Sequence, residues 1–209
     1  VDDKLLGSIV PYMSIVAGAA FLLLILVFRS ILVPLTAALG FLLSMAATFG
    51  ATVLIFQEGA LGLISDPGPI VSFLPIMLIG LVFGLAMDYQ VFLVTRMREE
   101  YVHGATPKQA MVKGYHHGAR VVTAAAIIMI SVFSAFMLEE NVAAKSMGFA
   151  LAVGVLLDAF IVRMVIIPSL LALMGEAAWW LPKWLDRILP NIDIEGAKLG
   201  PRTAPEPEE

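Results

Sequence analysis

The sequence predicts an all-α protein, a polytopic membrane helix bundle with five transmembrane helices and short interfacial helices. The 209 residues are 60% hydrophobic and only 14% charged, whereas soluble domains have about 45–50% apolar and about 25% charged residues. Five segments are long enough to cross a hydrocarbon core, which requires about 20 apolar residues in a helix. None of them shows the alternation of a membrane β-strand.

The five predicted spans lie within residues 1–175, which form one bundle domain. Pro34 lies in the first turn of the second span, where its missing N–H costs no hydrogen bond. Glycine and proline between the second and third spans predict a loop at 57–69. We place the spans at about residues 9–28, 31–56, 70–95, 121–138 and 147–167.

Two segments outside the spans are predicted to lie at the membrane surface. In the loop 96–120, Thr106 and Pro107 are typical of an N-cap followed by the first helical residue. They predict a short helix that ends near Tyr115, before His116-His117-Gly118. Residues 176–195 contain three tryptophans with basic neighbours, and indole rings prefer the headgroup level. The Pro- and Glu-rich end, 196–209, is predicted to be disordered.

The distribution of charge predicts the orientation, because Lys and Arg concentrate in cytoplasmic loops. One side carries Arg29, Arg96, Arg98, Lys108, Lys113, Arg120, Lys183 and Arg187. The other carries Asp2, Asp3, Glu58, Asp66, Glu139 and Glu140, with Lys4 and Lys145 as its cations. We therefore expect the N-terminus outside and the C-terminus in the cytoplasm. The acidic start lacks the basic region of a signal peptide, so we expect a piece of a longer protein whose upstream span delivers that N-terminus.

Asp88 and its neighbour Tyr89 are the first candidate functional residues. Asp88 lies eight residues before Arg96, the inner boundary of the third span, and therefore about 12 Å into the core. An ionisable residue there costs roughly 2.5–3.5 kcal/mol and usually marks a pathway or a proton relay. The competing interpretation is a buried carboxyl group that only locks helices together by hydrogen bonding.

Small residues accompany Asp88 on one face of its helix. Gly80 and Gly84 precede it at intervals of four, so the three share a face. Glycines let another helix approach closely, and we expect the carboxylate to point into such an interface. Burial disfavours the charged form of a carboxyl group, and hydrogen bonds favour it. A carboxyl group in which these two effects oppose each other can bind and release a proton.

Asp158 is a second carboxylate near the middle of a span. Arg163 follows five residues later, about 140° around an α-helix, so the two are not expected to pair within the helix. A secondary proton relay and a helix lock both remain open for Asp158. Ser131 and Ser134 could supply hydroxyl groups to a carboxylate, although serines in membrane helices more often bond their own backbone.

Several chemistries find no support in the sequence. Cysteine is absent, which excludes disulfides and thiol catalysis. The histidines lack metal-ligand spacing, and no Gly-rich phosphate-binding loop is present. No Lys/Arg-rich run suggests nucleic-acid binding. We therefore expect no cofactor, no metal and no enzymatic activity, and an ion gradient as the energy source.

Two motifs resemble one family of transporters. Residues 84–100, GLAMDYQVFLVTRMREE, are similar to the Asp-Tyr signature of the MMPL group of the resistance–nodulation–division (RND) superfamily. Residues 156–164, LLDAFIVRM, with Pro168 and the WWLP of 179–182, resemble that family's final transmembrane helix. The resemblance covers residues 5 to about 190. It implies spans eight to twelve of twelve, which is half of an RND transmembrane domain.

The resemblance also implies a function and its residues. Asp88 and Tyr89 match the second-half Asp-Tyr pair, which works with a similar pair from the N-terminal half of the transporter. Asp158 and Arg163 match the family pattern without a fixed role. We expect proton-motive-force-driven export of lipids or hydrophobic compounds by proton antiport across the bacterial cell membrane. Membrane lipids and the N-terminal half are the expected partners, and a homo-oligomer is compatible with the sequence.

Two other functions remain as alternatives. Sterol-sensing proteins share the same helical bundle, so a non-transporting sensor or assembly factor is one of them. An intramembrane aspartyl protease that uses Asp88 and Asp158 as a dyad is the other, because two carboxylates sharing a proton is sound acid–base chemistry. Its Tyr-Asp and Gly-x-Gly-Asp motifs, however, are absent from this sequence.

Overall fold

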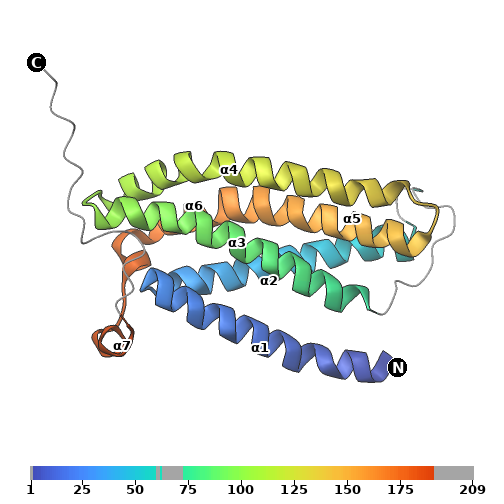
Figure 1. The fold of residues 1–209 in the computed structure, drawn as a ribbon, viewed down its shortest axis with the longest axis horizontal. Coiled ribbons are helices and arrows are strands. Elements are labelled where there is room, and N and C mark those ends of the chain that lie inside the picture. Colours follow the sequence, from blue (N-terminus) through green and yellow to red (C-terminus); the bar gives the residue numbers. More distant parts are fainter. Residues whose placement is uncertain (1, 60–61, 63–72, 191–209) are drawn as a thin grey trace, which may run out of the picture.

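The computed structural model describes residues 2–59, 62 and 73–190. Every regular element in these residues is a helix, and five helices are long and apolar enough to cross a membrane. They run along one common direction as an elongated bundle (Figure 1). The predicted fold class is confirmed. Most of the predicted loop 57–69, part of the interfacial segment and the whole tail 196–209 lie outside the described residues.

The first two spans form a helical hairpin with a tight turn. Helix α1, Asp2–Phe28, is followed by α2, Leu32–Thr52, which continues as one π-helical segment, η1, Val53–Gln57. Arg29, in the turn, has a positive φ of 47°. The Ser30 hydroxyl accepts a 3.3 Å bond from the Val33 N–H and so satisfies one free donor in the first turn of α2.

Helices α3, Leu74–Val102, and α4, Pro107–Ala135, pack closely against each other, and the short 3₁₀ turn η3, Phe136–Leu138, follows α4. A Cβ on Gly114 would lie 2.5 Å from the Cα of Met97, and one on Gly118 would lie 2.8 Å from a Leu93 methyl group. The two backbones therefore meet at these glycines.

Helix α4 corrects one sequence prediction. Thr106 is its N-cap, as expected, and it forms a capping box with Gln109. The helix does not end near Tyr115, however, but continues through His116-His117-Gly118 to Ala135. A single glycine is tolerated inside a helix, and Gly118 is held there by the packing of α3.

The last span is one long helix with a change of winding in its middle. It comprises α5, Val142–Leu156, the π-helical η4, Leu157–Ile166, and α6, Ile167–Met174. It continues beyond the predicted end at residue 167. Pro168 lies in the first turn of α6 and does not break the helix, whereas Gly175, with a φ of 56°, ends it.

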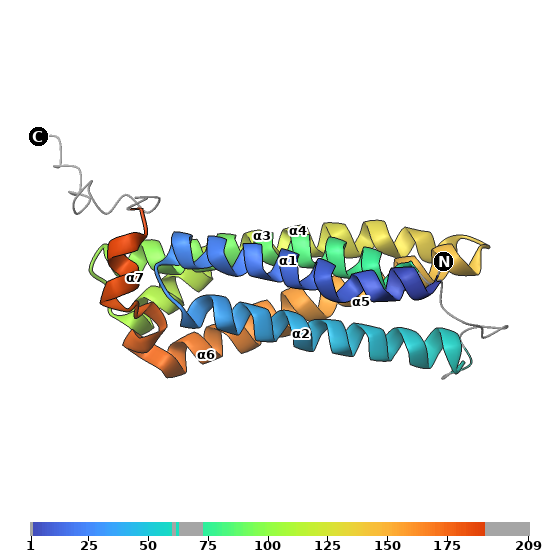
Figure 2. The same ribbon diagram turned by 90° about the horizontal axis from the view of Figure 1, so that it is seen from below.

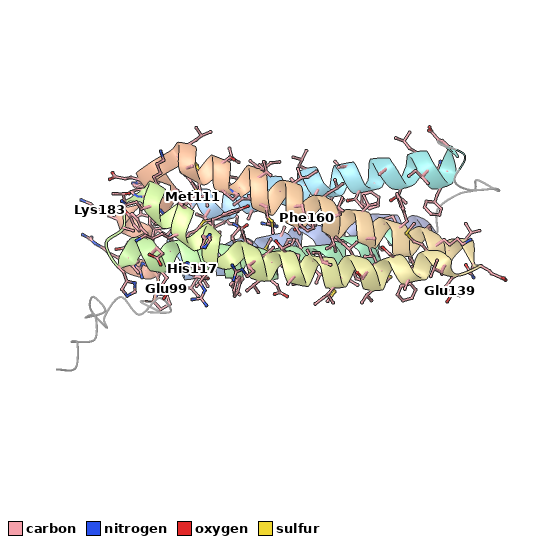
Figure 3. The ribbon with its side chains drawn as sticks, turned by 90° about the horizontal axis from the view of Figure 1, so that it is seen from above. Glu99, Met111, His117, Glu139, Phe160 and Lys183 are labelled. Atoms are coloured by element: carbon pink, nitrogen blue, oxygen red, sulfur yellow. The ribbon has the colours of Figure 1, made fainter. Side chains whose placement is uncertain are left out.

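The chain then crosses one end of the bundle. A 3₁₀ segment, η5, Gly175–Trp179, leads to the short helix α7, Lys183–Ile188. Helix α7 is seen end-on in Figure 1 and lengthwise in Figure 2, so it lies across the direction of the spans. Figure 3 places Lys183 and Glu99 at this end and Glu139 at the other.

Aromatic and polar contacts hold this crossing segment in place. The Trp179 ring stacks on Tyr101 at the end of α3, with centroids 5.4 Å apart. The Arg98 guanidinium lies over both rings. The Ser30 hydroxyl donates to the Ala178 carbonyl over 2.5 Å. The ends of α2, α3 and α6 are therefore joined on this side of the bundle.

Candidate functional site

Four polar side chains from three helices form a buried cluster inside the bundle. Asp158 is 1% exposed, and Arg163 and Gln90 are fully buried. The Ser44 hydroxyl donates to Asp158 Oδ1 and Arg163 Nε donates to Asp158 Oδ2, each over 3.2 Å. Arg163 Nη1 donates to Gln90 Oε1. We call Ser44, Gln90, Asp158 and Arg163 the buried polar cluster; it connects α2, α3 and η4.

The ion pair between Asp158 and Arg163 contradicts the expectation that they would not pair. That expectation assumed α-helical geometry, in which residues five apart diverge. Segment η4 is π-helical, and the hydrogen bonds of a π-helix join residue i to residue i+5. The two side chains therefore lie on the same face. Because each charge compensates the other, the local winding is what makes both tolerable away from water.

Three buried donor atoms around this cluster have no acceptor among the described residues. They are the Tyr89 hydroxyl, Gln90 Nε2 and Arg163 Nη2. Tyr89 is within electrostatic reach of both Asp158 and Asp88. Since an unsatisfied buried donor is costly, these atoms mark a place that water or another polar group can occupy.

Asp88 itself faces away from the cluster. It is exposed in this chain, as is Gly84, whose Cβ position has nothing within 4 Å. A Cβ on Gly80 would lie 2.6 Å from the Tyr12 hydroxyl of α1, so the close approach predicted at Gly80 is made by α1. The described residues do not supply the predicted close contact at Asp88 and Gly84, which remains a prediction for a further helix.

The two serines predicted to supply hydroxyl groups to a carboxylate, Ser131 and Ser134, are not members of the buried polar cluster. Ser131 is exposed and donates to the backbone oxygen of Ile127 over 2.8 Å. Ser134, three residues later, is partly buried on the same helix. The serine that bonds Asp158 is Ser44, which was not among the predicted residues.

Two members of the buried polar cluster, Gln90 and Ser44, are recognisable in the sequence although they were not predicted. Gln90 is a polar residue in the same apolar run as Asp88 and Tyr89. Ser44 belongs to a series of small and polar residues spaced four apart, which share one face of α2. All of them are buried: Thr36, Gly40, Ser44, Thr48 and Thr52.

A polytopic membrane bundle with a carboxylate-containing cluster inside its spans is typical of membrane transporters. The family comparison gives this class a name. The model of the MMPL family matches residues 8–190, so the chain belongs to the MMPL family of the RND superfamily.

Curated relatives match over most of this chain. The membrane protein YdfJ of Bacillus subtilis is 54% identical over 99% of the chain and 29% of its own length. The mycolic acid-containing lipids exporter MmpL11 of Mycolicibacterium smegmatis is 37% identical over 93% of the chain and 20% of its own length. The trehalose monomycolate exporter MmpL3 of Mycobacterium tuberculosis is 36% identical over 86% of the chain and 19% of its own length. The chain thus spans less than a third of each relative.

Proposed function

We propose that this chain is the proton-relay part of a transporter that uses the proton-motive force to export lipids or hydrophobic compounds. The observation that carries the proposal is the sequence Asp88-Tyr89-Gln90 on α3. Asp88 lies on the exposed surface of the bundle, and Gln90, two residues later, belongs to the buried polar cluster. The three residues therefore connect an exposed carboxylate to that cluster. The names of MmpL11 and MmpL3, both lipid exporters, support the class of cargo.

In the proposed mechanism, Asp88 takes up a proton and loses its negative charge. The groups of the N-terminal half that face Asp88 then hold α3 less strongly. Because Gln90 accepts a bond from Arg163, a movement of α3 is transmitted to η4 and the last span. Coupling of protonation to such a helix shift is the basis of alternating access.

Asp158 and Arg163 have two candidate roles within this mechanism. As a secondary relay, Asp158 would exchange a proton through the unpartnered donors near Tyr89. As a helix lock, the pair would hold α2, α3 and η4 together through Ser44 and Gln90. Complete burial and pairing of both charges favour the lock, whereas the unpartnered donors favour the relay.

The proposed location is the bacterial cell membrane, with the N-terminus of this chain outside and the C-terminus in the cytoplasm. The excess of Lys and Arg at the end that carries α7 supports this orientation. Membrane lipids and the N-terminal half of the transporter are the proposed partners, the latter at the face of Asp88.

Asp88→Asn in the full-length protein tests the relay. The amide is nearly isosteric but cannot carry a proton, so we expect proton-driven export to fall at least about tenfold, equivalent to about 1.4 kcal/mol. Export is measured in reconstituted vesicles with an imposed pH gradient. Glu139→Gln, an exposed carboxylate at the acidic end of the bundle, is the matched control. Wild-type export with normal proton dependence in Asp88→Asn would refute the relay.

The same assay separates the alternatives. A non-transporting sensor would move no cargo in vesicles at any pH gradient. For a protease, both carboxylates would have to share a proton, yet Asp158 is held by Ser44 and Arg163 and not by Asp88. Peptide cleavage that is lost on substitution of either aspartate would nevertheless support the protease.

A further inference from the structure

The C-terminal segment from Trp180 to Ile188 presents an exposed face that the proposed function does not use. Helix α7 lies across the direction of the spans, at the end of the bundle that also carries the ends of α3 and α6 (Figures 1 and 2). A helix in this position runs parallel to the membrane plane, near the level of the headgroups.

The two sides of α7 differ in chemistry. Asp186, on the side facing the bundle, forms an ion pair with Arg29 in the turn between α1 and α2. On the outer side, Trp184 and Ile188 are four residues apart, which places them on one face of the helix. Trp180 lies in the extended stretch before α7. Trp180 is 58% exposed, Trp184 is 64% and Ile188 is 71%.

Two basic residues border these apolar side chains. Lys183 and Arg187 are four residues apart, both are exposed, and neither has an ion pair within the described residues. The only carboxylate of α7, Asp186, is already paired with Arg29. Glu176 in η5 and Glu99 of α3 are further acidic groups at this end of the bundle. The outer side of α7 is therefore apolar along one line and cationic along the next.

We propose that this face, Trp180, Lys183, Trp184, Arg187 and Ile188, docks on the anionic phospholipid surface of the adjacent leaflet. Indole rings prefer the boundary between headgroups and acyl chains. Basic side chains beside them reach the phosphates while their stems stay in apolar surroundings. Anionic lipids attract such residues within a Debye length. Because apolar side chains lie beside basic ones, this face matches the acyl chains and phosphates of a lipid surface, which favours lipid over protein as its occupant.

Docking has a structural consequence. Arg29 and Asp186 link α7 to the turn between α1 and α2, and Ser30 bonds Ala178 in the preceding segment. A lipid-bound α7 therefore holds the ends of the first two spans at a fixed depth. The inference requires only that the bundle is embedded in a membrane, so it stands apart from proton coupling.

Spin labels on the full-length protein test the docking. This chain has no cysteine; cysteines elsewhere are replaced by serine, and Trp184→Cys and Ile188→Cys are labelled one at a time. Collisions with oxygen and with a water-soluble nickel chelate are compared in nanodiscs of phosphatidylcholine alone and of equal parts phosphatidylcholine and phosphatidylglycerol. Lys108→Cys, at the exposed start of α4, is the reference for water.

We expect both labels to collide preferentially with oxygen in the mixed nanodiscs, unlike the label at Lys108. In K183Q/R187Q, the oxygen-to-nickel ratio should fall at least about twofold in mixed nanodiscs, to the value in phosphatidylcholine alone. An unchanged label at Lys108 shows that the variant is folded. Labels shielded from both reagents would show that protein covers the face. Shielding from both reagents would overturn the proposal. So would an oxygen-to-nickel ratio equal to that at Lys108, or an unchanged ratio in K183Q/R187Q.

Discussion

Three consecutive residues of α3 have different surroundings. Asp88 is exposed, whereas Tyr89 and Gln90 are buried. Successive residues of an α-helix point about 100° apart, so Gln90 lies far around the helix from Asp88 and reaches Arg163. One helix therefore presents a carboxylate to the outside of this chain and an amide to its interior.

Substitution of Arg163 tests the energetics of the buried pair. Arg163→Met leaves Asp158 without a compensating charge, and such a change typically costs about 3–5 kcal/mol. We expect a lower unfolding temperature of the purified full-length protein in detergent. In D158N/R163M, where both charges are absent, most of the loss should be recovered. Equal stability of Arg163→Met and the wild type would show that the pair contributes nothing to the fold.

At the scale of elements, local winding and close packing decide which side chains meet. The π-helical winding of η4 brings residues five apart together. A Cβ on Gly40 of α2 would lie 2.5 Å from a Val162 methyl group of η4, so α2 also approaches η4 closely. Absence of a side chain at one position of α2 thus helps place Ser44 within reach of Asp158.

Glycine contacts between α3 and α4 give a second stability prediction. In Gly114→Ala, the new methyl group would collide with the Met97 backbone, and overpacking typically costs about 1–3 kcal/mol. Gly50→Ala is the matched control, because nothing lies within 4 Å of its Cβ position and alanine favours a helix by roughly 0.5–1 kcal/mol. We expect a lower unfolding temperature only for Gly114→Ala. Equal shifts in both variants would contradict the close approach of the two helices.

At the scale of the whole molecule, the bundle has a basic end and an acidic end. Arg29, Lys108 and Lys183 belong to the first, and Glu139 and Glu140 lie in the connection at the second. The lateral surface between them is apolar, as a bundle in lipid requires. Among the described residues, Asp88 places an exposed carboxylate on this surface, which is why we propose that its face meets the N-terminal half.

Cysteine labelling of intact cells tests the orientation. In a full-length protein without other cysteines, Glu139→Cys should react with a membrane-impermeant maleimide. Lys108→Cys should react only after the membrane is permeabilised, because positive residues remain in the cytoplasm. The reverse pattern would place the basic end outside. It would leave the fold intact and require a different explanation of the charge distribution.

Hydropathy, breaker residues and charge were sufficient to predict the class, the number of spans and the charged residues inside them, but not Ser44 and Gln90. These signals are local or periodic, so they can be read along the chain. The same signals selected Asp88, Tyr89, Asp158 and Arg163 as candidates, and the family motif added the predicted relay role of Asp88 and Tyr89. The N-cap at Thr106 was also predicted, since its contact joins residues only three apart.

Only the tertiary structure decided how the polar residues pair. Whether Asp158 meets Arg163 depends on π-helical winding, which the periodicity of an apolar helix does not reveal. Ser44 and Gln90 join the pair because α2 and α3 pack against η4, over separations of 114 and 73 residues. The length of α4 likewise followed from its contact with α3. Sequence determined which charges lie within the apolar helices; packing determined what each one touches.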